Sequence, residues 1–133
     1  MARGRRLSPP LFLLLAVAAG LGVSRRYLDV VEVRGHSMAP ALKPGDRLLV
    51  ESRSFERRQP RPGEIVLAAD PRDDGRELIK RVTAVDATAG EAEVRGDSPD
   101  ASTDSRTFGA VPLASIRWRA AFRYWPLGRA GRL

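Results

Sequence analysis

Short runs of apolar residues, separated by glycine, proline and aspartate, follow one another from Tyr27 to the C-terminus. Each run spans about four to nine residues, and runs of this length between turn residues are typical of β-strands. No 3.6-residue amphipathic period is present after residue 26, so the pattern predicts a small, mainly β domain, antiparallel and partly closed, tied to an N-terminal helix. The expected strands are Tyr27–Val33, Arg47–Val50, Glu64–Ala68, Leu78–Val85, Glu91–Arg95 and Arg117–Trp125.

The segments between the expected strands carry clear turn signals. Lys43-Pro44-Gly45-Asp46, Arg61-Pro62-Gly63 and Asp73-Asp74-Gly75 contain proline, which presets φ, or glycine, which permits a positive φ. Ser52–Pro62 is polar and is expected to form an exposed loop. Pro112–Ser115 is expected to form one helical turn.

Aromatic and basic side chains fall on opposite faces of the last expected strand, because successive side chains of a strand alternate. We expect the aromatic face to pack on the core and the basic face to be solvated. The alternative is an aromatic edge that contacts a membrane, since Trp, Tyr and Arg favour the interface. The aromatic face comprises Trp118, Phe122 and Tyr124, and the basic face comprises Arg117, Arg119 and Arg123.

An apolar run of 13 residues, Leu11–Val23, lies between arginines near the N-terminus. Extended back to Leu7 the run has 17 residues, at the short end for a spanning helix of roughly 20 residues. We expect a short membrane anchor, whose orientation the arginines on both sides leave open. The alternatives are a cleaved signal peptide, because Ala16-Val17-Ala18 has small residues at the right spacing, and a helix buried in the soluble domain. The expected division is 1–26, a basic segment with the anchor helix, and 27–133, a β-rich domain.

The 133 residues include 21 arginines, two lysines, one histidine and no cysteine. A sequence without cysteine has no thiol nucleophile, disulfide framework or thiolate metal site. Because His36 is the single histidine, a multi-histidine metal site within one chain is also excluded. A Ser-His-Asp triad would need His36 as its base. The length suggests one folded domain.

The net charge of +7 is concentrated at the two ends of the chain. Residues 1–26 and 111–133 each carry five arginines and no acid, whereas residues 27–110 carry a net charge of −3. A nucleic-acid-binding domain usually gathers its basic residues on the recognition face, so no nucleic-acid partner is expected. Basic ends around an apolar run suit an anionic membrane surface, and a lipid bilayer is an expected partner.

Ser37 lies between an expected strand and a proline-bounded turn. Such a place can expose a hydroxyl and bring backbone N–H groups together, as a nucleophile with an oxyanion hole requires. An ordinary turn serine is the simpler interpretation of this segment alone. His36 is a poor base for Ser37, because adjacent side chains on an extended segment point to opposite faces.

Lys80 is the stronger candidate for a base. On a strand it shares one face with Leu78, Val82 and Ala84, where desolvation favours the neutral amine that a general base needs. Arginine cannot serve, because it stays protonated in proteins. An edge lysine that prevents aggregation is the alternative interpretation. Lys43, in its Pro-Gly turn, is expected to be solvated and is the weaker candidate.

A third segment, 96–109, is dense in hydroxyl and carboxylate groups and poor in apolar residues. It is either a solvated loop or a polar network that orients the catalytic groups. Together with the first two segments it resembles the type I signal peptidase family, serine proteases with a Ser–Lys dyad. The motifs come in the family's order over nearly the whole chain: the N-terminal apolar run, Ser37-Met38-Ala39-Pro40 with Gly45-Asp46, Lys80-Arg81-Val82, and Gly96-Asp97 with Ser102-Thr103-Asp104-Ser105-Arg106 and Gly109.

The resemblance implies a role for each matching residue. Ser37 would be the nucleophile, Lys80 the general base, and Ser102 the serine that holds this lysine by a hydrogen bond. Some members add a hydroxyl two positions before the nucleophile, but Gly35 stands there, so such an oxyanion donor would come from backbone or water. The other supporting residues are Asp104 and Arg106, which match a buried pair that shapes the site, with Met38 and Pro40 of the nucleophile motif.

The resemblance implies a serine endopeptidase that removes an N-terminal leader from a precursor protein through an acyl-enzyme, with no metal or other cofactor. The segment Ile116–Gly131 is similar to compact members that mature nickel superoxide dismutase, so the expected substrate is that precursor or a general preprotein. We expect a monomer with one N-terminal anchor at a bacterial plasma membrane. The alternatives are a catalytically inactive membrane-anchored domain that only binds peptides, and a self-cleaving repressor, which would need a DNA-binding domain where the anchor lies.

Overall fold

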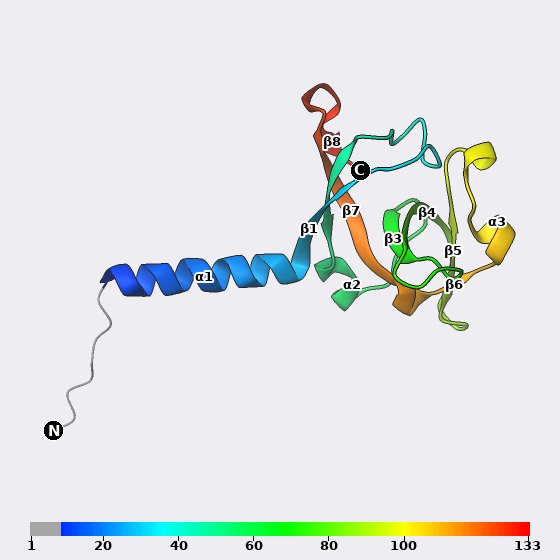
Figure 1. Ribbon diagram of the computed structural model, residues 1–133. Helices are drawn as coiled ribbons and strands as arrows, with labels where there is room; N and C mark the ends of the chain where they lie inside the picture. Colours follow the sequence, from blue (N-terminus) through cyan, green and yellow to red (C-terminus); the bar gives the residue numbers. More distant parts are fainter. Residues whose placement is uncertain (1–8) are drawn as a thin grey trace.

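The structure, a computed structural model, describes residues 9–133. Within this range eight strands form one sheet in the order β1-β2-β7-β3-β4-β5-β6, and β8 pairs with β7 (Figure 1). Every pairing is antiparallel, which confirms the expected mainly β fold. The strands are β1 (Leu28–Glu32), β2 (Arg47–Glu51), β3 (Ile65–Ala69), β4 (Glu77–Asp86), β5 (Glu91–Arg95), β6 (Val111–Pro112), β7 (Ile116–Trp125) and β8 (Gly131–Arg132).

The six strands expected from apolar runs are all present, each end within one residue of its expected position. The short strands β6 and β8 were not expected, because two residues are too few to show a period. The helical turn expected at Pro112–Ser115 is a 3₁₀ turn over Leu113–Ser115. Two further 3₁₀ turns cover Pro99–Ala101 and Leu127–Arg129.

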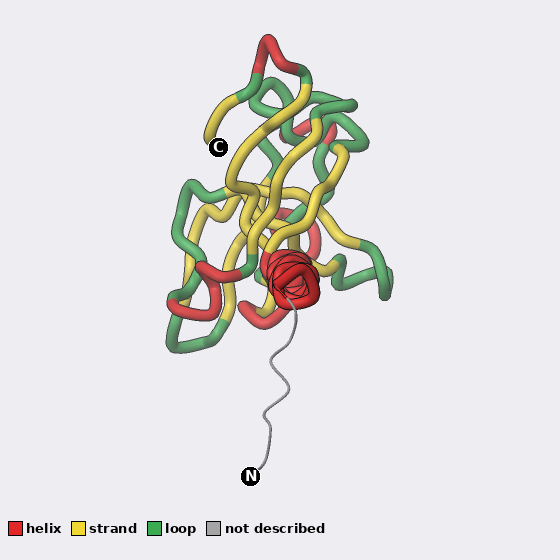
Figure 2. Tube along the Cα trace, turned by 90° about the vertical axis from the view of Figure 1, so that its left-hand side faces the viewer, coloured by secondary structure: helices red, strands yellow, loops and turns green. Residues whose placement is uncertain are grey.

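Helix α1 (Pro9–Tyr27) projects away from the sheet, as Figure 1 shows, and Figure 2 views it end-on. Its apolar side chains between Leu13 and Leu21 include several that are 52–67% exposed. The interpretation of this run as a helix buried in the soluble domain is therefore wrong. Among the described residues, no helix combines the length and hydropathy needed to cross a membrane.

The segment Ser52–Pro62 differs from the exposed loop that was expected. It contains helix α2 (Arg53–Arg57), whose first turn is stabilised by a hydrogen bond from Ser54 N to the carboxylate of Glu51 at 2.9 Å. Phe55 packs against the hydrophobic core. Glu51 helps to explain why a helix forms here, because its carboxylate satisfies an N–H that the start of a helix otherwise leaves without a partner.

The faces expected for the last strand are wrong at Phe122 and Arg123. The Phe122 residue is 38% exposed, whereas the Arg123 side chain is only 15% exposed and binds Asp46. The cause is a pair of register shifts, at which β7 has one residue more than β2. An extra residue reverses the alternation of side chains beyond it, so Arg123 lies opposite the buried Leu48.

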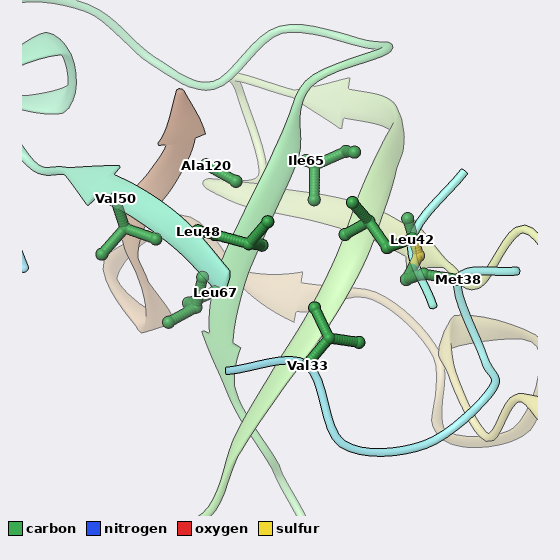
Figure 3. Close-up of a cluster of buried hydrophobic side chains, with 8 residues drawn as sticks. All are labelled: Val33, Met38, Leu42, Leu48, Val50, Ile65, Leu67 and Ala120. Carbon is green, nitrogen blue, oxygen red and sulfur yellow. The ribbon is translucent and has the colours of Figure 1, made fainter. Parts of the chain in front are cut away.

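The hydrophobic core has two parts that meet at the central strand β3. Because both faces of β3 are covered, its side chains alternate between the two parts, with Ile65 and Leu67 in the first and Val66 and Ala68 in the second. The first part, drawn in Figure 3, comprises Val33, Met38, Leu42, Leu48, Val50, Ile65, Leu67 and Ala120. Met38 and Leu42 come from the segment around Ser37, so the core also fixes that segment.

Leu48→Ala tests the first part of the core. Leu48 is fully buried, and we expect its truncation to lower the free energy of unfolding by about 2–5 kcal/mol through lost burial and a cavity. Leu127→Ala is the matched control, because Leu127 is 75% exposed and its loss should change stability by less than about 0.5 kcal/mol. Urea unfolding of both variants measures the difference. Equal effects would contradict the assignment.

Candidate active site

The loop of residues 34–45, which carries Ser37, is closed at its base by two backbone hydrogen bonds. Val33 N donates to Asp46 O at 2.8 Å, and Gly45 N donates to Val33 O at 2.9 Å. Met38 and Leu42, which are 1% and 0% exposed, fix the loop to the core. Ser37 is half-buried, whereas its neighbour Met38 is held in the interior. This 34–45 segment carries the candidate nucleophile and is called the nucleophile loop below.

Lys80 lies in β4 on the face that points into the core, between Leu78 and Val82. Lys80 is 4% exposed, and Leu78 and Val82 are 8% and 1% exposed, as the alternation of the strand predicts. Ala84 does not share this face and is exposed, because β4 and β5 have a register shift between Val82 and Ala84. Beyond Val82, the next residue of β4 that packs on the core is Val85.

Burial lowers the pKa of Lys80 below its ordinary value, because an ammonium loses its hydration there. The negative charge of Asp104 acts in the opposite direction and raises the pKa. The positive charges of Arg106, Arg72 and Arg76 lower it again. The net effect favours the neutral amine, the form that can accept a proton.

A chain of hydrogen bonds leads from Lys80 to a buried carboxylate. Lys80 Nζ donates to Ser102 Oγ at 3.0 Å, and Ser102 Oγ donates to Asp104 Oδ2 at 2.6 Å. Asp104 is 0% exposed, and it also accepts hydrogen bonds from Gly96 N at 2.8 Å and Arg106 Nε at 2.9 Å. The structure thus brings Lys80, Ser102, Asp104 and Arg106 together.

Burial alone would raise the pKa of Asp104, but the hydrogen bonds from Arg106, Ser102 and Gly96 outweigh burial and lower the pKa. The carboxylate is therefore ionised at neutral pH. An ionised Asp104 accepts a hydrogen bond from the Ser102 hydroxyl and so fixes the direction in which that hydroxyl points.

Gly96 lies where the nucleophile loop meets the hydrogen-bonded chain of Lys80, Ser102 and Asp104. A Cβ atom at residue 96 would lie 2.3 Å from Ser102 Oγ and 2.5 Å from Ser37 O, so a larger residue cannot fit without movement. Ser98 N donates to Ser37 O at 2.9 Å in the same place. The backbone of Ser37 and the side chain of Ser102 thus lie on either side of Gly96, and Ser102 in turn binds Lys80.

Ser37 and Lys80 line the same cleft, of about 670 Å³. Residues 32–38 form one wall and residues 76–80 the other, and Ala101 and Thr103, in and just after the 3₁₀ turn Pro99–Ala101, also line the cleft. Of the supporting residues, Gly35 and Met38 line the cleft, whereas Pro40 is exposed and is not among the lining residues. His36 also lines the cleft and is exposed, as expected of a rim residue.

One wall of the cleft, residues 77–80, is a strand edge. Within residues 9–133, β5 pairs with β4 only from Arg81 onward, so residues 77–80 have a strand partner, β3, on one side only. β1, which leads into the other wall, stands at one end of the strand order. An extended peptide between the two walls could therefore hydrogen-bond to backbone groups, as in β-strand addition.

Arg72 and Arg76 also line the cleft, and the sequence analysis did not single them out. They lie in the turn between β3 and β4, where Arg72 donates two hydrogen bonds of 2.8 and 2.9 Å to the buried carboxylate of Asp70. Arg76 Nε lies 3.8 Å from the same carboxylate. No local signal separates these arginines from other charged residues of a turn, because their position depends on Asp70 being buried.

Among residues 9–133, no group of three or more histidine, aspartate or glutamate side chains could hold a metal ion. The polar groups beside Lys80 satisfy one another, and no buried side-chain nitrogen or oxygen in the described part of the chain lacks a hydrogen-bond partner. The arrangement suits proton transfer between a hydroxyl and an amine.

Comparison with known proteins shows the family of the chain. Residues 7–89 match the family described as signal peptidase, peptidase S26. The chain is 35% identical to the mitochondrial ATP-independent inner membrane protease subunit 1a of Arabidopsis thaliana, over 80% of this chain and 76% of the relative. It is 30% identical to the human mitochondrial inner membrane protease subunit 1, over 78% of this chain and 74% of the relative.

A bacterial relative covers more of the chain. The probable signal peptidase I-1 of Synechocystis is 29% identical, over 90% of this chain and 84% of the relative. The match of residues 7–89 includes both the nucleophile loop and Lys80. The chain belongs to the signal peptidase family, peptidase S26.

Proposed function

We propose that the protein is a serine endopeptidase that removes an N-terminal leader from a precursor protein, with Ser37 as nucleophile and Lys80 as general base. The observation that carries the proposal is the placement of Lys80. It is buried on an apolar face, its Nζ is held by Ser102, and it lines the same cleft as Ser37. A lysine so placed can be neutral and is held in a fixed position, which are two properties that a base needs.

In the proposed reaction, neutral Lys80 Nζ accepts the proton of Ser37 Oγ as that oxygen attacks the scissile carbonyl carbon. The C–N bond then breaks, and the leaving amine takes the proton from Lys80. Water then attacks the acyl-enzyme while Lys80 accepts a proton from it, the ester C–O bond to Ser37 breaks, and Ser37 Oγ takes that proton back from Lys80. Ser37 N–H supplies one donor to the oxyanion. Gly35 has no side-chain donor, so any second one is a backbone group or a water.

The leader is proposed to bind in extended form between residues 32–36 and residues 77–80. Those backbone groups of the two segments that make no hydrogen bond within the chain would form its main-chain hydrogen bonds. Resemblance to the family adds a preference for small residues at the first and third positions before the cut. Two substrate classes remain, a nickel superoxide dismutase precursor, favoured by the resemblance of Ile116–Gly131, and a general preprotein. Incubation with one precursor of each class and sequencing of the new N-terminus tests this proposal.

We also propose that the protein acts as a monomer at an anionic membrane surface through α1 and the residues at its base. Arg26 and Arg53 lie over the ring of Tyr27, with guanidinium carbons 5.6 and 5.9 Å from its centre. Both arginines are exposed. Exposed arginines next to an aromatic ring and an apolar helix match the chemistry of a phospholipid headgroup region.

The chain's two lysines provide a matched test of the dyad. Lys80→Met and Lys80→Arg should each lower kcat/KM for leader cleavage by about a thousandfold or more, because neither side chain can accept a proton. Lys43→Met and Lys43→Arg should leave cleavage unchanged, because Lys43 is exposed and does not line the cleft. Cleavage by the Lys80 variants at the rate of the Lys43 variants would rule out the dyad. A wild-type protein that binds both precursors but cuts neither would support the inactive peptide-binding alternative.

The pH dependence of kcat should follow the protonation of Lys80. The lysine is inactive when protonated, so activity is lost as pH falls through its pKa, and this acidic limb should lie below the ordinary lysine value of 10.5. Arg76→Gln removes a positive charge that lowers the pKa of Lys80, and it should move the limb to higher pH. The Arg76 side chain is 61% exposed, so the fold should tolerate the change. Arg95→Gln, in β5, is the control, and a limb that stays in place in both variants would contradict the prediction.

Binding to vesicles tests the membrane surface. Vesicles that contain anionic phospholipid should bind the protein, and Arg26→Gln combined with Arg53→Gln should weaken binding by about 30-fold, at about 1 kcal/mol for each arginine. The control combines Arg61→Gln with Arg95→Gln, which removes the same charge away from α1. Sedimentation at several salt concentrations measures binding. Equal weakening in the two double variants would mean that net charge, and not this surface, is responsible.

A further inference from the structure

Asp46 is a buried carboxylate at the base of the nucleophile loop, and two arginines from the C-terminal part of the chain bind it. Asp46 is 2% exposed. Arg129 Nη1 donates to Asp46 Oδ1 at 2.9 Å, and Arg123 Nη1 donates to Asp46 Oδ2 at 3.2 Å. Within the loop, Lys43 N donates to Asp46 Oδ2 at 3.0 Å. A single carboxylate thus connects the loop with the strand β7 and the 3₁₀ turn that follows it.

Arg123 adds two hydrogen bonds to backbone carbonyl groups to its ion pair with Asp46. Its Nη1 also donates to Ala41 O, inside the nucleophile loop, at 2.8 Å. Its Nε donates to Arg129 O at 2.6 Å and so fixes the turn that presents the second arginine. A planar guanidinium can hold three acceptors in fixed directions, whereas the ammonium of lysine cannot reproduce this fork. The register shifts that turn Arg123 inward are what make these contacts possible.

The other side of the loop is held by different contacts. Ser37 O accepts the hydrogen bond from Ser98 N at 2.9 Å, and the side chains of Met38 and Leu42 lie in the core. The serine is therefore fixed between one anchor at residue 98 and another at residues 41–46. Loss of the second anchor would leave the apolar contacts in place but free the backbone that follows Ser37.

Small movements of a nucleophile have large effects, since a displacement of about 1 Å can lower the rate about 100-fold. We infer that Asp46, Arg123 and Arg129 form a positioning cluster, through which the C-terminal segment 123–129 holds the nucleophile loop in its reactive geometry. The inference rests on the proposed function of Ser37. None of the three side chains is among those that line the cleft, so they act through the loop and not on the substrate.

Two variants with a matched control test the cluster. Arg129→Gln and Arg123→Lys should lower kcat for leader cleavage by about 10- to 100-fold and change KM less than about twofold, because substrate contacts remain while the serine is displaced. Arg132→Gln should leave both constants unchanged, since Arg132 is exposed and lies just beyond segment 123–129, in β8. An unchanged kcat in the first two variants would overturn the inference, as would a loss of equal size in Arg132→Gln.

Amide hydrogen exchange provides a measurement that does not depend on cleavage. In Arg129→Gln, exchange at Lys43 and Gly45 should become faster by about tenfold or more, while exchange at Val66 in the core stays unchanged. Faster exchange at Val66 to the same degree would indicate general destabilisation and contradict the cluster's local role. Unchanged exchange at Lys43 and Gly45 would contradict it as well. Because exchange is measured without substrate, a failure of the proposed peptidase activity in the wild type is distinguished from a failure of the cluster.

Discussion

The burial of one lysine is the constraint around which the site is arranged. Transfer of an ammonium out of water is costly, and the apolar neighbours Leu78 and Val82 offer it no partner. The hydrogen bond to Ser102 and the nearby charge of Asp104 reduce this cost, while Arg106 neutralises the aspartate in turn. Lys80 is thus held in place by hydrogen bonds, while its surroundings still favour the neutral amine.

The sheet leaves room for a substrate because β4 changes partners along its length. Its second half pairs with β5, and its first half has a strand partner on the β3 side only. Lys80 stands at the boundary between the two halves. Beyond the end of β5 the chain turns at Gly96, where the absence of a side chain lets Ser102 and Ser37 approach one another. The binding cleft and the candidate chemical groups therefore result from the same change in strand pairing.

Arginine and lysine have separate physical roles in this protein. Each of the buried aspartates Asp46, Asp70 and Asp104 is paired with arginine, which stays protonated and donates in fixed directions. A lysine in place of one of these arginines could lose its proton, and its ammonium group could rotate. The task proposed for the lysine at residue 80 is the opposite one, since only a cation that can become neutral is able to act as a base. The arginines that bind the buried aspartates are thus tied to structure, and the buried Lys80 to the proposed chemistry.

Local sequence determined the six longer strands, the buried face of Lys80 and the order of the motifs, because a period of two residues and a Pro-Gly turn are properties of neighbouring residues. The tertiary structure decided what is distant along the chain. Ser102 meets Lys80 across 22 residues, and Arg123 meets Asp46 across 77. The inward turn of Arg123 and the exposure of Phe122 depend on where β7 has extra residues relative to β2. Such register shifts arise from the pairing of whole strands in the folded sheet, so no pattern within one strand reveals them.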